Sequence, residues 1–262
     1  MKKEQSVLFT QELWDTIDQL RVLMLEKQVN TNKENNFLKN KEIYDLTRFT
    51  HLDYPNELAC IVWFSGCNMR CQYCYNDDIV FNKEGNYSYD EVLDFLKKRV
   101  GLLDGVVLSG GEATSKNLIE FCQQIKKLGF LIKLDTNGIN YNKIKELIEL
   151  NLLDYIALDY KATQQKFEKI TASNKFGEFN KTLLYLVEQK FNFEVRTTLH
   201  SDLLNSEDIN TIIEDLHKKG YKNTFYIQRF VDTQTNIGNI HSEVTKFVKN
   251  DIRSDLLDVI YR

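Results

Sequence analysis

Three cysteines within eight residues, Cys67, Cys71 and Cys74, are the side chains of this chain best suited to chemistry. Thiolates are the ligands that hold iron–sulfur clusters, and a short loop can wrap this spacing around one cluster. Because only three thiolates are present, one iron of a four-iron cluster would keep a coordination position without a protein ligand. An open position distinguishes catalytic from structural metal sites. The triplet therefore predicts a catalytic iron–sulfur centre.

A zinc site is the main alternative for these cysteines. Structural zinc usually takes four protein ligands. No fourth cysteine or histidine lies near the triplet, and the nearest histidine is His51. The other two cysteines, Cys60 and Cys122, fall in an apolar run and in a helical pattern, where free cysteine behaves as a small hydrophobic residue. The donor set favours iron–sulfur over zinc.

Polar residues end three later apolar runs. Residues 109–112 read Ser-Gly-Gly-Glu, residues 134–138 read Leu-Asp-Thr-Asn-Gly, and residues 158–161 read Leu-Asp-Tyr-Lys. In folds built from parallel strands, ligands gather at the carboxyl ends of the strands. Asp135 and Asp159 close neighbouring runs, so a shared site there is geometrically reasonable.

The elements that must position these residues alternate regularly from about residue 58. Alternation of strand and helix predicts a parallel sheet with right-handed crossovers. Six units are too few for a closed eight-stranded barrel, so the expected fold is α/β, a partial (β/α)6 TIM-like barrel with an open parallel sheet and helices outside. The candidate strands are residues 58–65, 105–109, 130–136, 153–159, 193–199 and 224–228, and the candidate helices 88–100, 115–128, 142–150, 163–190 and 205–219.

Three segments differ in character. Residues 1–45 are expected to form an N-terminal helical extension and linker, because apolar residues of about 9–28 fall on one helical face. Packing on the flank of the domain and docking of a partner both remain open for that helix. Residues 46–230 form the expected core, and residues 231–262 a C-terminal tail packed on it.

Composition limits the classes of partner. The formal net charge is −4 and the isoelectric point about 5.7, so no broad basic face for nucleic acid is expected. No apolar run reaches membrane-spanning length, and the first residues lack the apolar region of a signal peptide. Five cysteines, three of them clustered, fit a reducing compartment. These features predict a cytoplasmic protein without nucleic-acid or membrane partners.

The motifs together resemble a known family. The segment Cys-Asn-Met-Arg-Cys-Gln-Tyr-Cys is similar to the Cys-x3-Cys-x2-Cys signature of radical S-adenosylmethionine (SAM) enzymes, including the aromatic Tyr73 before the third cysteine. With the strand-end segments at 110–112, 135–138 and 159–161, the set resembles the glycyl-radical-enzyme activating proteins. Within them it is most similar to the activating protein of the anaerobic ribonucleoside-triphosphate reductase. Tyr75 departs from the histidine that is common at its position.

The resemblance implies a chemistry and partners. The cofactors would be a [4Fe–4S] cluster and SAM, which is cleaved reductively to a 5′-deoxyadenosyl radical. The protein substrate would be a glycyl-radical enzyme, the anaerobic (class III) ribonucleotide reductase, from which that radical removes a glycine hydrogen. The electron donor would be of flavodoxin or ferredoxin type.

The resemblance also assigns site residues. The three cysteines would ligate the cluster, and the Gly-Gly-Glu segment would approach the methionine end of SAM. Asp135 and Thr136 would line SAM or a nearby monovalent cation. Asp159 and Lys161 match the family's Asp-x-Lys, whose lysine would meet the SAM carboxylate. Arg196 would clamp the same carboxylate, and Gln228 would touch the adenosine. The implied cofactor-binding residues are Tyr73, Gly110, Gly111, Glu112, Asp135, Thr136, Asp159, Lys161, Arg196 and Gln228.

Two other functions stay open. A radical SAM enzyme could act on another glycyl-radical enzyme or on a small molecule such as a deazapurine precursor, and it would then cleave SAM in a manner dependent on that substrate. A non-catalytic metal-binding or electron-transfer module would show four metal-bound thiolates in the isolated protein, and it would not need the strand-end motifs.

Overall fold

The structure is a computed structural model that describes residues 19, 36–233, 235–241 and 251–262. The chain separates into two compact units, Met1–Asn40 and Lys41–Arg262. The helix expected over residues 9–28 lies outside the described residues, apart from Gln19. The fold and the site described below belong to the second unit.

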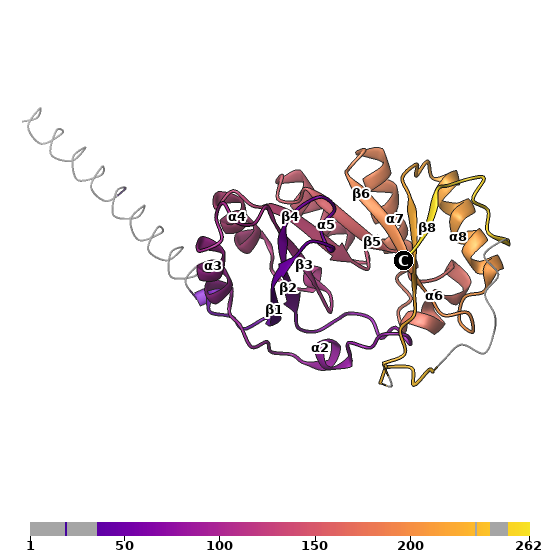
Figure 1. Cartoon of the computed structure of the whole chain (residues 1–262), viewed down its shortest axis with the longest axis horizontal. Coiled ribbons are helices and arrows are strands. Elements are labelled where there is room, and N and C mark those ends of the chain that lie inside the picture. The colour runs from indigo at the N-terminus through magenta and orange to yellow at the C-terminus, as the bar shows by residue number, and fades with distance from the viewer. Residues whose placement is uncertain (1–18, 20–35, 234, 242–250) are drawn as a thin grey trace, which may run out of the picture. The chain divides into compact units, whose positions relative to one another are not determined.

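One curved sheet forms the centre of the unit Lys41–Arg262 (Figure 1). Its eight strands follow chain order from β1 to β8. The first pair is antiparallel and every later pair is parallel. No pairing joins β8 to β1 among the described residues, so the sheet stays open. The strands are β1 (Ile43–Thr50), β2 (Ala59–Phe64), β3 (Gly105–Gly110), β4 (Leu131–Thr136), β5 (Tyr155–Asp159), β6 (Phe193–Leu199), β7 (Phe225–Arg229) and β8 (Val259–Tyr261).

Helices connect the parallel strands along the outer side of the sheet (Figure 1). Ser88 and Glu91 form a capping box at the start of α3 (Tyr89–Lys97), which satisfies backbone N–H groups that a helix start leaves free. This arrangement confirms the predicted partial barrel with helices outside. The helices are α2 (Asp77–Phe81), α3 (Tyr89–Lys97), α4 (Ile119–Lys127), α5 (Tyr141–Glu149), α6 (Gln164–Thr171), α7 (Phe176–Glu188) and α8 (Ser206–Lys218), with a 3-10 turn η1 (Ala113–Ser115) after β3.

Apolar side chains fill the barrel near the amino ends of the strands. Tyr54, Ala59, Ile61 and Val107 form a buried cluster, on which the partly buried Trp63, Leu131 and Tyr155 pack. Successive side chains of a strand point to opposite faces, so residues two and four further along the same strands continue the inner face. There the side chains are polar and include Ser109, Lys133, Asp135 and Asp159. The alternation along the strands therefore places a polar layer next to this apolar cluster, toward the carboxyl ends of the strands. The cluster and the three side chains that pack on it are here called the apolar floor.

The outermost strands were not predicted from the sequence. β1 begins at Ile43, three residues before the expected start of the core, and its apolar residues do not alternate regularly. β8 has only three residues, Val259–Tyr261, and it extends the sheet beyond β7 with parallel pairing. β1 is stabilised by pairing with β2, and β8 by pairing with β7. The local sequence pattern does not reveal these pairings.

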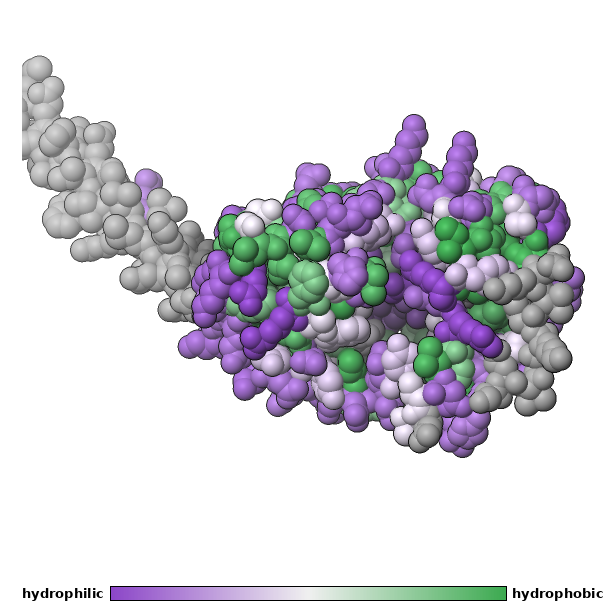
Figure 2. Space-filling model, in the orientation of Figure 1, coloured by the Kyte–Doolittle hydropathy of each residue, from purple (hydrophilic) through white to green (hydrophobic). Residues whose placement is uncertain are grey.

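The described surface is mixed in polarity. On the face shown in Figure 2, hydrophobic residues form small groups between hydrophilic ones. Among the described residues, no helix is long and apolar enough to cross a bilayer.

Candidate active site

A cavity of about 440 Å³ opens at the carboxyl ends of the parallel strands. The cysteine loop after β2 and the polar strand ends of β3 to β7 form its walls. The structure brings every site residue expected from the sequence to this one cavity. Its lining includes Cys67, Cys71, Tyr73, Cys74, Gly110, Gly111, Glu112, Asp135, Thr136, Asp159, Lys161, Arg196 and Gln228.

The cysteine loop is held by backbone hydrogen bonds to the end of α6. Arg70 N donates to Thr171 O over 2.8 Å, and Gln72 N donates to Ile170 O over 2.9 Å. Within the loop, Cys74 N donates to Cys71 O over 3.0 Å. The spacing of the triplet therefore corresponds to a short turn that is anchored on both sides of Cys71.

A C-terminal segment, residues 236–241, braces the same loop and is here called the strap. Ile237 N donates to Cys74 O over 3.0 Å, and Gly238 N donates to Gln72 O over 2.8 Å. A Cβ atom on Gly238 would lie 2.6 Å from the Cβ of Gln72, so only glycine allows this approach. The strap's last residue offers its carbonyl to the ring Nε2 of His200 at 2.7 Å. Sequence reasoning found no signal for the strap, because its partners are distant in the chain.

The three thiols suit a soft metal cluster. All three cysteines of the triplet are free. Burial raises the pKa of Cys67 to about 12 and that of Cys71 to about 11, so without metal both are neutral thiols, whereas a bound metal deprotonates its thiol ligands. No three His, Cys, Asp or Glu side chains in the described part of the chain are arranged for a single metal ion. In a four-iron cluster each thiolate binds a different iron, and three thiolates on one wall fit that requirement.

The end of β3 runs against the start of the cysteine loop. Glu112 N donates to Gly66 O over 2.9 Å. A Cβ atom on Gly111 would lie 2.0 Å from that same carbonyl oxygen, which leaves no room for any side chain. Gly111 is thus required by backbone packing beside Cys67, in addition to the role toward a ligand that the resemblance implies.

Glu112 itself is buried, with 2% of its surface exposed. Its Oε1 accepts hydrogen bonds from Thr114 N and Oγ1 and, over 2.8 Å, from Thr136 Oγ1. Its Oε2 accepts from Asn137 N over 2.8 Å. Burial raises the pKa of Glu112 against the opposing effect of these hydrogen bonds. The carboxylate joins the end of β3 to that of β4, a structural role that sequence reasoning did not foresee.

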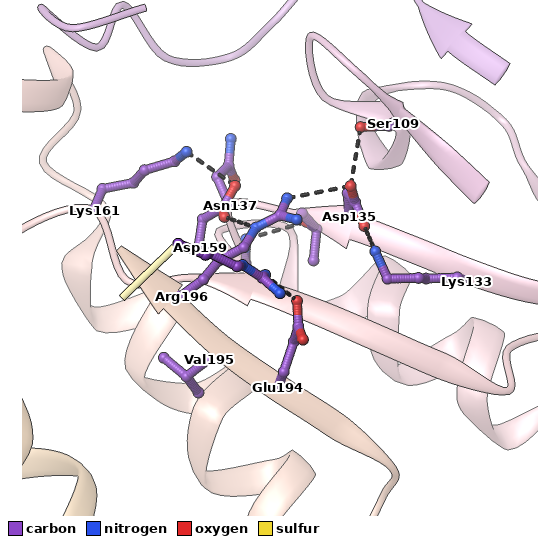
Figure 3. Close-up of polar contacts among 12 residues, drawn as sticks. Ser109, Lys133, Asp135, Asn137, Asp159, Lys161, Glu194, Val195 and Arg196 are labelled. Carbon is purple, nitrogen blue, oxygen red and sulfur yellow. Dashed lines mark hydrogen bonds and ion pairs between the residues drawn. The ribbon is translucent and has the colours of Figure 1, made fainter. Parts of the chain in front are cut away.

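Five charged side chains from β4, β6 and the end of β5 form an ion-pair layer (Figure 3). Arg196 lies between two aspartates, with Nη2 at 3.2 Å from Asp135 Oδ2 and Nε donating to Asp159 Oδ1. Lys161 Nζ donates to the other oxygen of Asp159 over 2.9 Å, and Lys133 donates to Asp135 Oδ1. Val195 points away from this layer (Figure 3), as the alternation of β6 requires.

Neighbouring opposite charges keep Asp135, Asp159 and Lys161 ionised although these side chains are largely buried. Burial alone would raise the pKa of Asp159, but Arg196 and Lys161 hold it at about 2. Arg196 and Lys133 likewise lower the pKa of Asp135 against the effect of burial. The pKa of Lys161 is raised although burial opposes its charge, because Asp159 lies beside it. Three cations face two anions, so the layer carries a formal charge of +1.

About half of the residues that line the cavity were not predicted from the sequence. Thr198 could have been found, since it follows Arg196 by two residues on β6. Arg262 gave no signal; its Nη2 donates to Glu194 Oε1 over 2.7 Å, and its guanidinium lies 4.1 Å from the ring centre of Tyr226. The lining residues outside the predicted set are Asp53, Trp63, Met69, Tyr75, Asn76, Val80, Ser109, Asn137, Thr198, Arg229, Phe230, Val231 and Arg262.

Comparison with known proteins gives related sequences and folds. Residues 61–218 match the family described as the radical SAM superfamily. A provisionally named glycyl-radical enzyme activating enzyme of Methanocaldococcus jannaschii is 34% identical over 171 residues, which cover 62% of this chain and 69% of that protein. The pyruvate formate-lyase-activating enzyme of Streptococcus mutans is 30% identical over 149 residues, 52% of this chain and 55% of that enzyme.

Among solved structures, Streptococcus suis SuiB bound to S-adenosylmethionine matches with a TM-score of 0.58 at 13% identity, over 77% of this chain and 51% of that chain. A likeness at this identity concerns the fold. This chain thus spans about half the length of SuiB and of the S. mutans enzyme.

Proposed function

Because this chain belongs to the radical SAM superfamily, as a member of its glycyl-radical-enzyme activating enzymes, we propose that it generates the glycyl radical of an anaerobic (class III) ribonucleotide reductase. The observation that supports the radical chemistry in this proposal is one cavity that is lined by three free cysteines and by cationic side chains at the strand ends. The superfamily's cofactors are a [4Fe–4S] cluster and SAM, and we assign both to this cavity.

Cys67, Cys71 and Cys74 would hold the cluster, and the set leaves one iron open for SAM. When bound, the cluster supplies the electron that cleaves SAM reductively. Hydrogen bonds to α6 and to the strap keep the cysteine loop in place before anything binds. Little of the binding free energy is therefore needed to order the loop.

The cationic layer would orient the methionine part of SAM. Arg196 and Lys161 keep N–H groups beyond those used for Asp135 and Asp159, and the net positive charge favours a carboxylate. Glu112 Oε2 accepts one described hydrogen bond, from Asn137 N, so it retains acceptor capacity for the ammonium group. Tyr73 and Gln228 also line the cavity, and we assign them to the space for the remainder of the ligand.

The class of protein substrate rests on the relatives. The M. jannaschii protein is named for the activation of a glycyl-radical enzyme, and the S. mutans protein for the activation of pyruvate formate-lyase. Our choice of the class III ribonucleotide reductase rests on the order of the strand-end motifs in the sequence. A flavodoxin- or ferredoxin-type donor in the cytoplasm would supply the electron.

Radical transfer to a partner protein tests the proposal. The reconstituted and reduced protein would be incubated without oxygen with SAM and either a class III ribonucleotide reductase or pyruvate formate-lyase, and electron paramagnetic resonance would record the glycyl radical. We expect the signal on the reductase. A signal on pyruvate formate-lyase alone would contradict the choice of partner, and SAM cleavage with no protein radical would favour a small-molecule substrate.

A further inference from the structure

The monovalent cation that the family resemblance implies beside Asp135 does not fit the residues found there. Asp135 Oδ1 accepts from the Lys133 ammonium. Its Oδ2 accepts from Ser109 Oγ over 3.2 Å and faces Arg196 Nη2 at 3.2 Å. Each Asp135 oxygen therefore already faces a cationic side chain, which would repel a metal ion bound there.

Lys133 reaches Asp135 from within the barrel. Residues 133 and 135 share the inner face of β4, one above the other, and 3% of the Lys133 side chain is exposed. Its strand neighbours in register are Val107 and Tyr155, which belong to the apolar floor. Asp135 lines the cavity and Lys133 does not, and the Lys133 ammonium reaches Asp135 on the side away from Arg196 (Figure 3).

The net charge of the layer is a second reason why a metal cation does not fit this site. Lys133, Lys161 and Arg196 outnumber Asp135 and Asp159 by one positive charge. A metal cation would raise the formal charge to +2 in a region shielded from water, where an uncompensated charge is costly. Without Lys133 the layer would be neutral, and a small cation could restore the charge that a carboxylate ligand requires.

We propose that the Lys133 ammonium is a built-in counter-cation of this site, so that the chain binds SAM without a monovalent metal ion. The inference rests on the proposed function, since it concerns the SAM pocket. It assigns to one buried lysine of the barrel interior the electrostatic role that a potassium or sodium ion would otherwise have. Loss of that ammonium would then convert the protein into one that needs such an ion.

The test compares SAM affinity in potassium chloride and in choline chloride at equal ionic strength, by calorimetry on the reconstituted protein. We expect the wild-type affinity to be equal in the two salts. Lys133→Met keeps the length of the side chain and removes its charge, and we expect it to bind about tenfold more weakly in choline and to regain affinity in potassium. Lys126→Met is the matched control, because Lys126 pairs with Asp154 outside the cavity, and it should behave as the wild type.

Thermal unfolding of the cofactor-free proteins in the two salts gives a second readout, which does not depend on SAM. Potassium should stabilise Lys133→Met and leave the wild type unchanged. A wild type whose affinity or unfolding temperature rises with potassium would overturn the inference. So would a folded Lys133→Met protein that binds SAM as tightly as the wild type in choline, or one that potassium does not rescue. If neither the wild type nor any variant binds SAM in either salt, the proposed function fails, while the unfolding data still decide the role of Lys133.

Discussion

At the scale of single residues, the site is a set of buried charges that depend on one another. Asp159 has two cationic partners, Arg196 and Lys161, and 17% of its side chain is exposed. Removal of one member of a buried ion pair leaves the other charge without compensation, which costs far more than the pair contributes. Changes in this layer should therefore affect folding as well as ligand binding.

Asp159→Asn should lower the free energy of unfolding of the cofactor-free protein by about 3 kcal/mol, because Arg196 and Lys161 stay buried. Urea titration at pH 7 measures the change. Asp94→Asn is the control, since Asp94 pairs with Lys97 in solvent with 64% of its side chain exposed, and we expect no measurable effect there. Equal effects of the two substitutions would show that the layer is not energetically coupled.

The same residue predicts a pH dependence. Folding lowers the pKa of Asp159 from 3.8 to about 2, so the unfolded chain binds its proton first as the pH falls. Its contribution is complete above about pH 4 and is lost as the pH falls through about 2. The difference in stability between the wild type and Asp159→Asn should be constant from about pH 5 to 8 and shrink below about pH 4. A stability difference that changes near neutral pH would show that a titratable group other than Asp159 causes it.

At the scale of elements, the cysteine loop depends on segments far away in the sequence. The loop follows β2, yet α6 and the strap hold it. Alternating apolar runs predicted β2 to β7 and the helices between them, because burial on both faces of a parallel sheet leaves a strong local signal. The strap, the short β8 and the carboxylate bridge of Glu112 leave no such signal, since each depends on one precise long-range contact.

Gly238→Ala should loosen the cysteine loop. The new Cβ would lie 2.6 Å from the Cβ of Gln72, and relief of such an overlap typically costs about 1–3 kcal/mol. We expect the variant to retain less iron than the wild type after anaerobic reconstitution and desalting. Gly177→Ala serves as the control, because a Cβ there meets nothing within 4 Å. Equal iron retention by the two variants would show that the strap does not support the loop.

At the scale of the whole molecule, the chemistry is concentrated in one of the two units. Every residue that lines the cavity lies within Lys41–Arg262. The strand-end motifs could be predicted to converge, because carboxyl ends of parallel strands meet at one edge of a sheet. The pairing of Arg196 with both aspartates could not, since it depends on how neighbouring strands align in register.

A chain that comprises residues 41–262 should therefore cleave SAM at a rate within about twofold of the full chain, because the cavity and its braces remain. Release of 5′-deoxyadenosine measures the rate for each protein. If residues 1–40 serve to dock the partner, the shorter chain will form less glycyl radical on that partner at an unchanged rate of SAM cleavage. Loss of cleavage in a folded 41–262 chain would contradict the assignment of the chemistry to this unit.

The most direct test of the account is the release of 5′-deoxyadenosine from SAM by the reconstituted and reduced protein in the absence of oxygen. The wild type and Cys122→Ala, which changes a buried cysteine away from the cavity, should release it. Cys67→Ala, Cys71→Ala and Cys74→Ala should each release none. Full release by any of these three variants, or no release from a wild type shown to hold a reduced four-iron cluster, would contradict the assignment of radical chemistry to the triplet.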